Sequence, residues 1–355
     1  MPVHERNSSP RGPRRSSVRW LSLLSLGLAT AIAFAGHFAY RAYWPSERQL
    51  LSRADAVVGI GDTAEAEALL KECIRRHDSV LARAKLVELY TNAEDFAQVS
   101  LLDKVTRRPL DPAGTGVLAR AFAQGYQAMA AKEFLAQEWA SASVHFQKAC
   151  EEYQVVTRAR RLPVLGGVEV SPALIAEWTF FRVDPNGAPE CLRKAIVASS
   201  KAGDSARVDR LVAIYRVDYA QQDDGSAALI DDLVALEDFD RALRFDSSDG
   251  AGQKTNAALG RAYSAVGSRA FEQEKWQSAA EHFVKAFARY REVNAGVGLE
   301  CLRNAVAAMR NARDRNQVIE LGEIFLAEYA RNREEFERDE GLRGYRLNVE
   351  SMMRD

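Results

Sequence analysis

From Pro45 onward, apolar residues recur at intervals of three and four, the spacing that places them on one face of an α-helix. The region is rich in Ala, Leu, Glu, Arg and Gln, which are strong helix formers. We therefore expect a helical domain over residues 46–355. The chain before Pro45 has a different pattern, because the run from Leu21 to Tyr40 contains no Asp, Glu, Lys or Arg.

That apolar run is long enough to cross a membrane. Its twenty residues would rise about 30 Å as a helix, the thickness of the hydrocarbon core of a bilayer. Trp20 and Trp44 flank the run, where aromatic side chains favour the lipid–water interface. We expect one transmembrane signal-anchor helix over residues 20–44. Residues 1–19 are rich in Pro, Ser and Arg, so we expect a disordered basic tail there.

Charge around the apolar run predicts its orientation. The first nineteen residues contain five arginines and a single acidic residue, Glu5. This bias favours a cytoplasmic N-terminus and an extracytoplasmic C-terminal domain, which is periplasmic if the source is bacterial. An alternative is open, because Ala33-Phe34-Ala35 has the small-x-small form that signal peptidase cleaves. Cleavage there would give a secreted protein.

The helical region contains an internal repeat. Residues 134–153 and 271–290 align without gaps and share nine identities. The shared pairs are Phe134/Phe271, Trp139/Trp276, Ser141/Ser278, Ala142/Ala279, His145/His282, Phe146/Phe283, Lys148/Lys285, Ala149/Ala286 and Tyr153/Tyr290. We infer two copies of one larger helical unit, block one at roughly 118–215 and block two at roughly 259–325.

A second shared segment extends both blocks. The sequence Glu190-Cys191-Leu192-Arg193 returns as Glu300-Cys301-Leu302-Arg303. Shorter and less regular units are indicated where Gly61-Asp62 and Gly203-Asp204 interrupt the apolar pattern.

The repeated segment resembles the second helix of the tetratricopeptide repeat. In that family, small residues stand where helices cross and large ones fill the space between them. The matching positions are Trp139, Ala142, Phe146 and Ala149 in block one, and Trp276, Ala279, Phe283 and Ala286 in block two. The fold that the resemblance implies is all-α: a tetratricopeptide-like solenoid of helical hairpins, preceded here by one transmembrane helix.

The resemblance also implies a binding surface. Solenoids of this kind use a concave groove, lined by the first helix of each unit, to bind a protein or peptide partner. The residues implied to face the groove are Gln124 and Gln127 in block one, and Arg261 and Ser264 in block two.

Block one carries an insert over residues 154–188 that block two lacks. It contains Gly166-Gly167 and a Pro-Asn-Gly turn signal, and it has the most strand-like composition in the chain. Repeat proteins often place insertions on the binding face, so Trp178, Phe180 and Phe181 could anchor a partner. An equally weighted alternative is a loop that covers exposed core at a helix end.

Composition excludes some functions. A formal net charge of −1 argues against general nucleic-acid binding, which needs a basic surface. The four cysteines lie far apart, with no spacing typical of a metal site; we interpret them chiefly as small buried hydrophobes, although a disulfide remains open. We expect no metal, no cofactor and no catalytic residues, and hence no enzyme.

Three further features look like sites but have simpler interpretations. The segment from Asp249 to Thr255 ends like a phosphate-binding loop, yet it lacks that motif's glycines and predicts a linker. The equivalent histidines His145 and His282 indicate a structural role. The pair Asp231-Asp232 is typical of a solvated helix face.

The sequence thus predicts a membrane-anchored scaffold or adaptor that presents an extracytoplasmic protein-binding surface. One alternative is a self-assembling envelope protein or homo-oligomer, because Gly27, Ala31 and Ala35 are spaced for close helix contact. Another alternative is a hydrolase or lyase with its site in the 154–188 insert.

Overall fold

The structure is a computed structural model that describes residues 30–33, 45–106, 112–161, 187–219, 222–247 and 252–354. Every regular element in these ranges is helical, without a strand among them. The all-α class is therefore confirmed for the described residues. The chain divides into an N-terminal unit, Met1–Leu86, and a C-terminal unit, Val87–Asp355.

The expected tail over 1–19 and the expected anchor helix over 20–44 lie outside the described residues, except for residues 30–33, which are helical and exposed. Among the helices that the structure does describe, none combines the length and the apolar character needed to span a bilayer.

The N-terminal unit contains a helical hairpin of α2 (Glu47–Gly59) and α3 (Thr63–His77), followed by the start of α4 (Val80–Asn92). Ser46 begins α2 with a capping box, in which its side chain accepts from the Gln49 amide and the Gln49 side chain accepts from the Ser46 amide. The two helices bury Ala54, Ala66 and Leu70 against each other.

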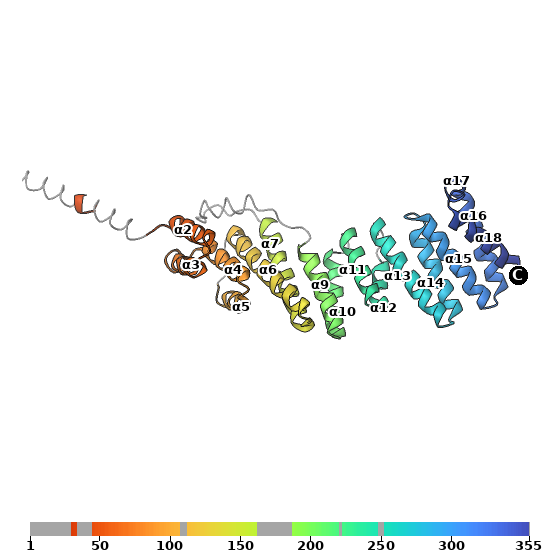
Figure 1. Ribbon diagram of the computed structural model, residues 1–355, viewed down its shortest axis with the longest axis horizontal. Helices are drawn as coiled ribbons and strands as arrows, with labels where there is room; N and C mark the ends of the chain where they lie inside the picture. Colours follow the sequence, from red (N-terminus) through yellow and green to blue (C-terminus); the bar gives the residue numbers. More distant parts are fainter. Residues whose placement is uncertain are drawn as a thin grey trace, which may run out of the picture. The chain divides into compact units, whose positions relative to one another are not determined.

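In the C-terminal unit, each helix packs chiefly against its neighbours in the chain (Figure 1). Its helices are α5 (Phe96–Val105), α6 (Pro112–Leu135), α7 (Trp139–Arg161), α9 (Gly187–Lys201), α10 (Ser205–Tyr219), α11 (Asp223–Ala235), α12 (Phe239–Leu243), η1 (Arg244–Ser247), α13 (Gln253–Glu272), α14 (Trp276–Tyr290), α15 (Ala295–Asn311), α16 (Arg315–Arg331), α17 (Arg333–Phe336) and α18 (Glu340–Arg354). Helix α7 thus continues to Arg161 and α9 begins at Gly187, so both ends of the expected 154–188 insert are helical.

One turn geometry closes the hairpins. In seven turns between described helices, a residue with φ between 56° and 85° precedes the cap of the second helix. These residues are Gly61, Glu94, Gln137, Gly203, Glu237, Glu274 and Arg313. The next N–H then donates to the carbonyl five residues earlier, as from Glu138 to Glu133 at 2.8 Å and from Lys275 to Ala270 at 2.9 Å. This is the bond that ends a helix in a Schellman motif.

The two blocks inferred from the sequence share contacts as well as residues. In block one, the Tyr126 ring lies 5.9 Å from the His145 ring and 4.8 Å from Lys148 Nζ. The Tyr126 hydroxyl donates to Asp103 Oδ2 at 2.7 Å. In block two the equivalent residues Tyr263, His282 and Lys285 repeat the ring contacts, and the Tyr263 hydroxyl donates to Asp246, a carboxylate from a different position in the chain. The sequence repeat is therefore also a repeat of packing.

Candidate functional site

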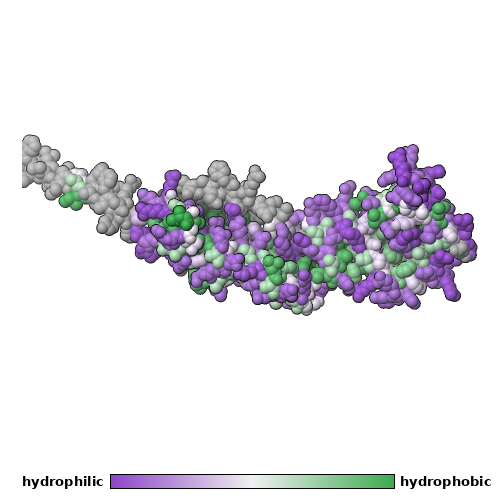
Figure 2. All heavy atoms as spheres, in the orientation of Figure 1, coloured by the Kyte–Doolittle hydropathy of each residue, from purple (hydrophilic) through white to green (hydrophobic). Residues whose placement is uncertain are grey.

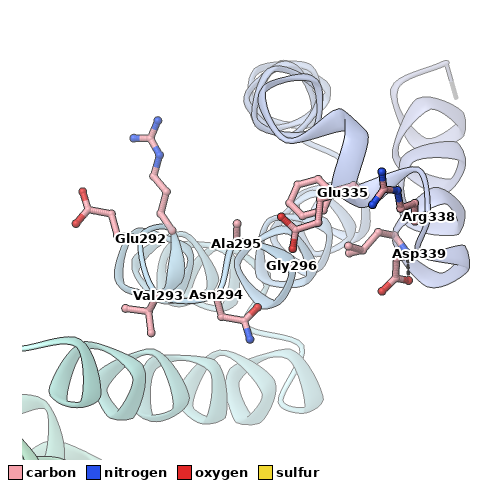
Figure 3. A pocket seen from close by; sticks show the side chains of 11 residues that line it. Glu292, Val293, Asn294, Ala295, Gly296, Glu335, Arg338 and Asp339 are labelled. Atoms are coloured by element: carbon pink, nitrogen blue, oxygen red, sulfur yellow. Dashed lines mark hydrogen bonds between the residues drawn. The ribbon is translucent and has the colours of Figure 1, made fainter.

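One cavity, with a volume of about 660 Å³, lies between the α14–α15 turn and the α17–α18 turn. Its polar groups do not converge: in Figure 3, Glu292 points away from the side on which Glu335, Arg338 and Asp339 lie. The Asn294 and Asp339 side chains already accept amide hydrogen bonds from the first turns of α15 and α18. We conclude that this cavity is a by-product of helix capping rather than a ligand site.

A second cavity of about 560 Å³ lies between α14 and α16 and has an apolar floor that includes Ala280, Val284 and Met309. The equivalent positions in block one are Ser143, Gln147 and Ser199. There, polar contacts join α7 to its neighbours: Ser143 Oγ lies 2.5 Å from Ser199 Oγ, and Arg207 donates to Gln147 at 2.8 Å. The blocks therefore differ on this face.

The third cavity, which we call the α6–α9 pocket, has a volume of about 370 Å³ and mainly apolar walls. Its lining residues are Ala131, Phe134 and Leu135 of α6, Phe146 of α7, Arg193, Lys194 and Val197 of α9, and Asp232 of α11. A concave apolar site with a few polar groups at its edge is the usual form of a site for a ligand side chain.

The floor of the α6–α9 pocket is rigidly held. Phe134 packs edge-to-face on Trp139, with ring centroids 4.8 Å apart at 79°, and lies 6.2 Å from Phe146. Phe146 and Ala142 are buried in the α6–α7 interface. By contrast Leu135, the last residue of α6, is 85% exposed at the edge of the pocket. An exposed leucine beside fixed aromatic rings is an apolar contact surface that nothing in the described residues covers.

Figure 2 shows the hydropathy of one face of the molecule. On the face shown, the C-terminal unit is mostly hydrophilic, and apolar residues form separate patches rather than a continuous stripe.

Of the residues predicted to bind a partner, the two on α6 lie close to this pocket along the helix. Gln124 is exposed, and Gln127 is half-buried and accepts a hydrogen bond from the Tyr153 hydroxyl at 2.9 Å. Neither lines the pocket, but Gln124, Gln127, Ala131 and Leu135 follow the helical repeat and so share one face of α6. The face of α6 that was predicted to bind a partner therefore includes two residues that line the pocket, Ala131 and Leu135.

The two predicted residues on α13 have partners inside the chain. The Arg261 guanidinium donates to both carboxylate oxygens of Asp231, at 2.8 and 2.7 Å. Ser264 hydrogen-bonds the side chain of Cys301, whose burial raises the pKa of its thiol to about 11. Neither Arg261 nor Ser264 lines the α6–α9 pocket.

The remaining predicted residues, Trp178, Phe180 and Phe181, lie outside the described residues. Asp231 and Asp232, interpreted from the sequence as a solvated helix face, keep part of their solvent exposure and also form ion pairs between helices. Both are half-buried, and besides the Asp231–Arg261 pair, Asp232 accepts from Arg193 at 2.6 Å. The two acids link α11 to α9 on one side and to α13 on the other.

The segment that resembles a phosphate-binding loop is occupied by a carboxylate from another part of the chain, Asp223. Residues 248–251 are outside the described part. Gln253, Lys254 and Thr255 had been expected to belong to a linker, but they form the start of α13. The Asp223 carboxylate accepts from the Lys254 amide at 3.0 Å and from the Thr255 amide at 2.7 Å. Burial would raise the Asp223 pKa, but these hydrogen bonds outweigh it and lower the pKa. A helix N-terminus capped in this way has no room for phosphate.

The histidines and cysteines are engaged in local contacts. His145 Nδ1 lies 2.7 Å from Glu133 Oε2, and Ser141 donates to the other oxygen of that carboxylate at 2.6 Å. Ser141 and His145 thus share an acceptor instead of forming a nucleophile–base pair. All four cysteines are buried and unbridged. Across the described ranges, no group of three His, Cys, Asp or Glu residues has the arrangement of a metal site.

Sequence reasoning missed the residues that make the α6–α9 pocket distinctive. Phe146 had been matched to a position that fills the space between helices and Phe134 had been noted only as a residue that the two blocks share, while Leu135, Lys194 and Val197 were not singled out. The signal lay in the comparison of the two blocks: block two has Glu272, Asn304 and Ala307 at the three equivalent positions. At the first of these positions an exposed leucine stands where block two has a glutamate, which indicates an apolar contact surface in block one.

Comparison with models of known protein families found no match to this chain, and comparison with curated proteins found none either. The choice of function therefore depends on the geometry described above.

Proposed function

We propose that this chain is a tetratricopeptide-like solenoid that binds a segment of a partner protein and performs no catalysis. The recurring hairpin turn supports the repeat architecture, because Glu94 follows Gly61 by 33 residues and Glu237 follows Gly203 by 34. The family unit has about 34 residues. The matched packing around Tyr126 and Tyr263 supports it further.

The observation that carries the binding function is the α6–α9 pocket with Leu135 at its edge. Binding free energy in protein interfaces is concentrated in a few apolar anchors that enter preformed pockets. The fixed Phe134 ring offers such a pocket, and its order before binding reduces the entropy lost on association.

The proposal includes a membrane anchor. The apolar run from Leu21 to Tyr40 has the length and flanking aromatics of a membrane span, and the arginines before it favour a cytoplasmic N-terminus. Anchoring would raise the local concentration of the binding surface near the membrane, so a modest intrinsic affinity would suffice.

Site-specific photocrosslinking tests the binding function. A photoreactive residue at Ala131, in the full chain in native membranes, is expected to yield an adduct with another protein that Leu135→Glu abolishes. The matched control is Ser268, the block-two equivalent of Ala131, where that adduct should be absent. The same adducts at both positions, or an adduct insensitive to Leu135→Glu, would contradict the proposal. Adducts only between copies of the chain would favour self-assembly instead.

A further inference from the structure

The chemistry at the edge of the α6–α9 pocket indicates the kind of segment it receives. Lys201 Nζ lies 4.6 Å from the centroid of the Trp139 ring and 5.1 Å from that of Phe134. Lys194 Nζ lies 5.9 Å from the Phe146 centroid. Two ammonium groups therefore stand over the aromatic residues that form and support the pocket floor.

These cations differ in how far they are neutralised. Arg193 is paired with Asp232 at 2.6 Å, and Lys194 with Glu190 at 2.8 Å. For Lys201, which is exposed, the described residues supply ring contacts and no carboxylate. The charge left uncompensated at the pocket is thus positive, and a partner with negative charge would complement it.

Block two serves as an internal reference. At the positions of Lys194 and Lys201 it has Asn304 and Asn311, and at the position of Leu135 it has Glu272. The apolar edge and both cations therefore occur together in block one, and all three are replaced together in block two. In block two the equivalent arginine, Arg303, stacks on the Tyr345 ring at 4.2 Å. The scaffold evidently tolerates the polar residues, so the block-one set is not required for folding.

We infer that the α6–α9 pocket receives a bulky apolar side chain of a partner segment in which aspartate or glutamate residues flank that side chain. The apolar group enters between Phe134, Phe146 and Leu135. One flanking carboxylate lies against Lys201. Another lies against Lys194 and displaces Glu190, with which Lys194 is paired in this structure. This inference rests on the proposed function, since it specifies the partner of the same site.

The preference for an apolar side chain flanked by acidic residues is tested by measuring peptide binding to the full chain in detergent micelles. Fluorescence anisotropy is the readout. The probes are three short labelled peptides: a central leucine flanked by glutamates, the same peptide with serine for leucine, and the same peptide with lysines for glutamates. We expect the first to bind at least about tenfold more tightly than either of the others, because burying a leucine and reversing several charges each change affinity by that order.

Variants of the chain then test whether the peptide binds at the α6–α9 pocket. Lys201→Asn and Leu135→Glu, both taken from block two, are each expected to weaken binding of the acidic peptide, and Lys201→Asn to reduce its dependence on salt. Val217→Glu is the control, since Val217 is 84% exposed on α10 and does not line the pocket. Its binding should equal that of the unaltered chain.

Equal affinity for acidic and basic peptides, or binding unaffected by Lys201→Asn, would overturn the inference. These results are separable from failure of the proposed function. A Leu135-dependent photocrosslink at Ala131 without acidic preference would refute only the partner chemistry. Loss of both the crosslink and all peptide binding would refute the binding function itself.

Discussion

The hairpin turns impose a local conformation that only some of their residues suit. The left-handed region costs about 1 kcal/mol or more for a residue with a Cβ atom, and glycine avoids this cost. Glycine occupies the position in two of the seven turns, at Gly61 and Gly203, while Gln137 and Glu274 adopt it with φ of 62° and 57°. In the latter turns, packing of the two helices must outweigh the local strain.

The difference in backbone strain between glycine and other residues at this turn position predicts opposite effects of two matched substitutions. Glu274→Gly should stabilise the chain by up to about 1 kcal/mol, because it relieves the left-handed strain at an exposed site. Gly203→Ala should destabilise by about 1 kcal/mol, although no atom lies within 4 Å of the added Cβ. Urea denaturation followed by circular dichroism measures both. If the two changes had the same sign, local backbone strain would not be the cause.

At the scale of helices, the first turn of α13 depends on a residue from another helix. Asp223 belongs to α11, and its carboxylate caps the amides of Lys254 and Thr255. The approach is so close that a Cβ on Gly252 would lie 2.3 Å from the carboxylate carbon. Thus the α11–α13 junction is set by a side-chain cap as well as by apolar packing.

Removing this cap should have a measurable, pH-dependent effect. Asp223→Ala is expected to destabilise the C-terminal unit by about 0.5–2 kcal/mol, the usual loss for a helix cap. Because the folded-state pKa of Asp223 is lowered, its contribution is complete above the ordinary carboxyl pKa and is lost as pH falls through the lowered value. Unfolding free energies of the two proteins should therefore converge in acid. A constant difference down to the lowest accessible pH would show that the charge of Asp223 is unimportant.

Much of the helical pattern could be predicted from the sequence, for reasons visible in particular residues. Ala142 and Phe146 are core positions because their spacing and size suit a helix crossing, and both blocks keep them. The turn at Gly203 was indicated because glycine marks it. The turns at Glu94, Glu237 and Arg313 were not indicated, since no residue type there signals a positive φ.

The candidate pocket could not be predicted in the same way. Its floor uses Phe134, which the sequence marked only as a residue shared by the two blocks, and Phe146, which it marked as a packing position of the repeat. Its edge brings together Leu135, Lys194 and Asp232 from three helices, and this proximity depends on how successive hairpins are stacked. Arg261 was expected to face a partner, but pairing with Asp231 across two helices is a tertiary feature that helical periodicity does not reveal.

At the scale of the whole molecule, the proposed membrane anchor can be tested directly. Deletion of residues 1–44 should release the chain from membranes, whereas the full chain should resist extraction with alkaline carbonate, because burial of about twenty apolar residues in lipid is effectively irreversible. A reporter that is active only outside the cytoplasm, fused after Asp355, should be active. Release of the full chain by carbonate would contradict anchoring, and a silent reporter would contradict the orientation.

We propose that block one binds a partner through the α6–α9 pocket and that block two does not bind through the equivalent surface. The most direct measurement gives block one the residues of block two, Leu135→Glu with Lys194→Asn and Val197→Ala, and quantifies coprecipitation of the protein crosslinked at Ala131. The account predicts a loss of about tenfold or more with an unchanged melting temperature, and full retention in the reciprocal control Glu272→Leu. Undiminished coprecipitation by the folded triple variant would contradict the claim.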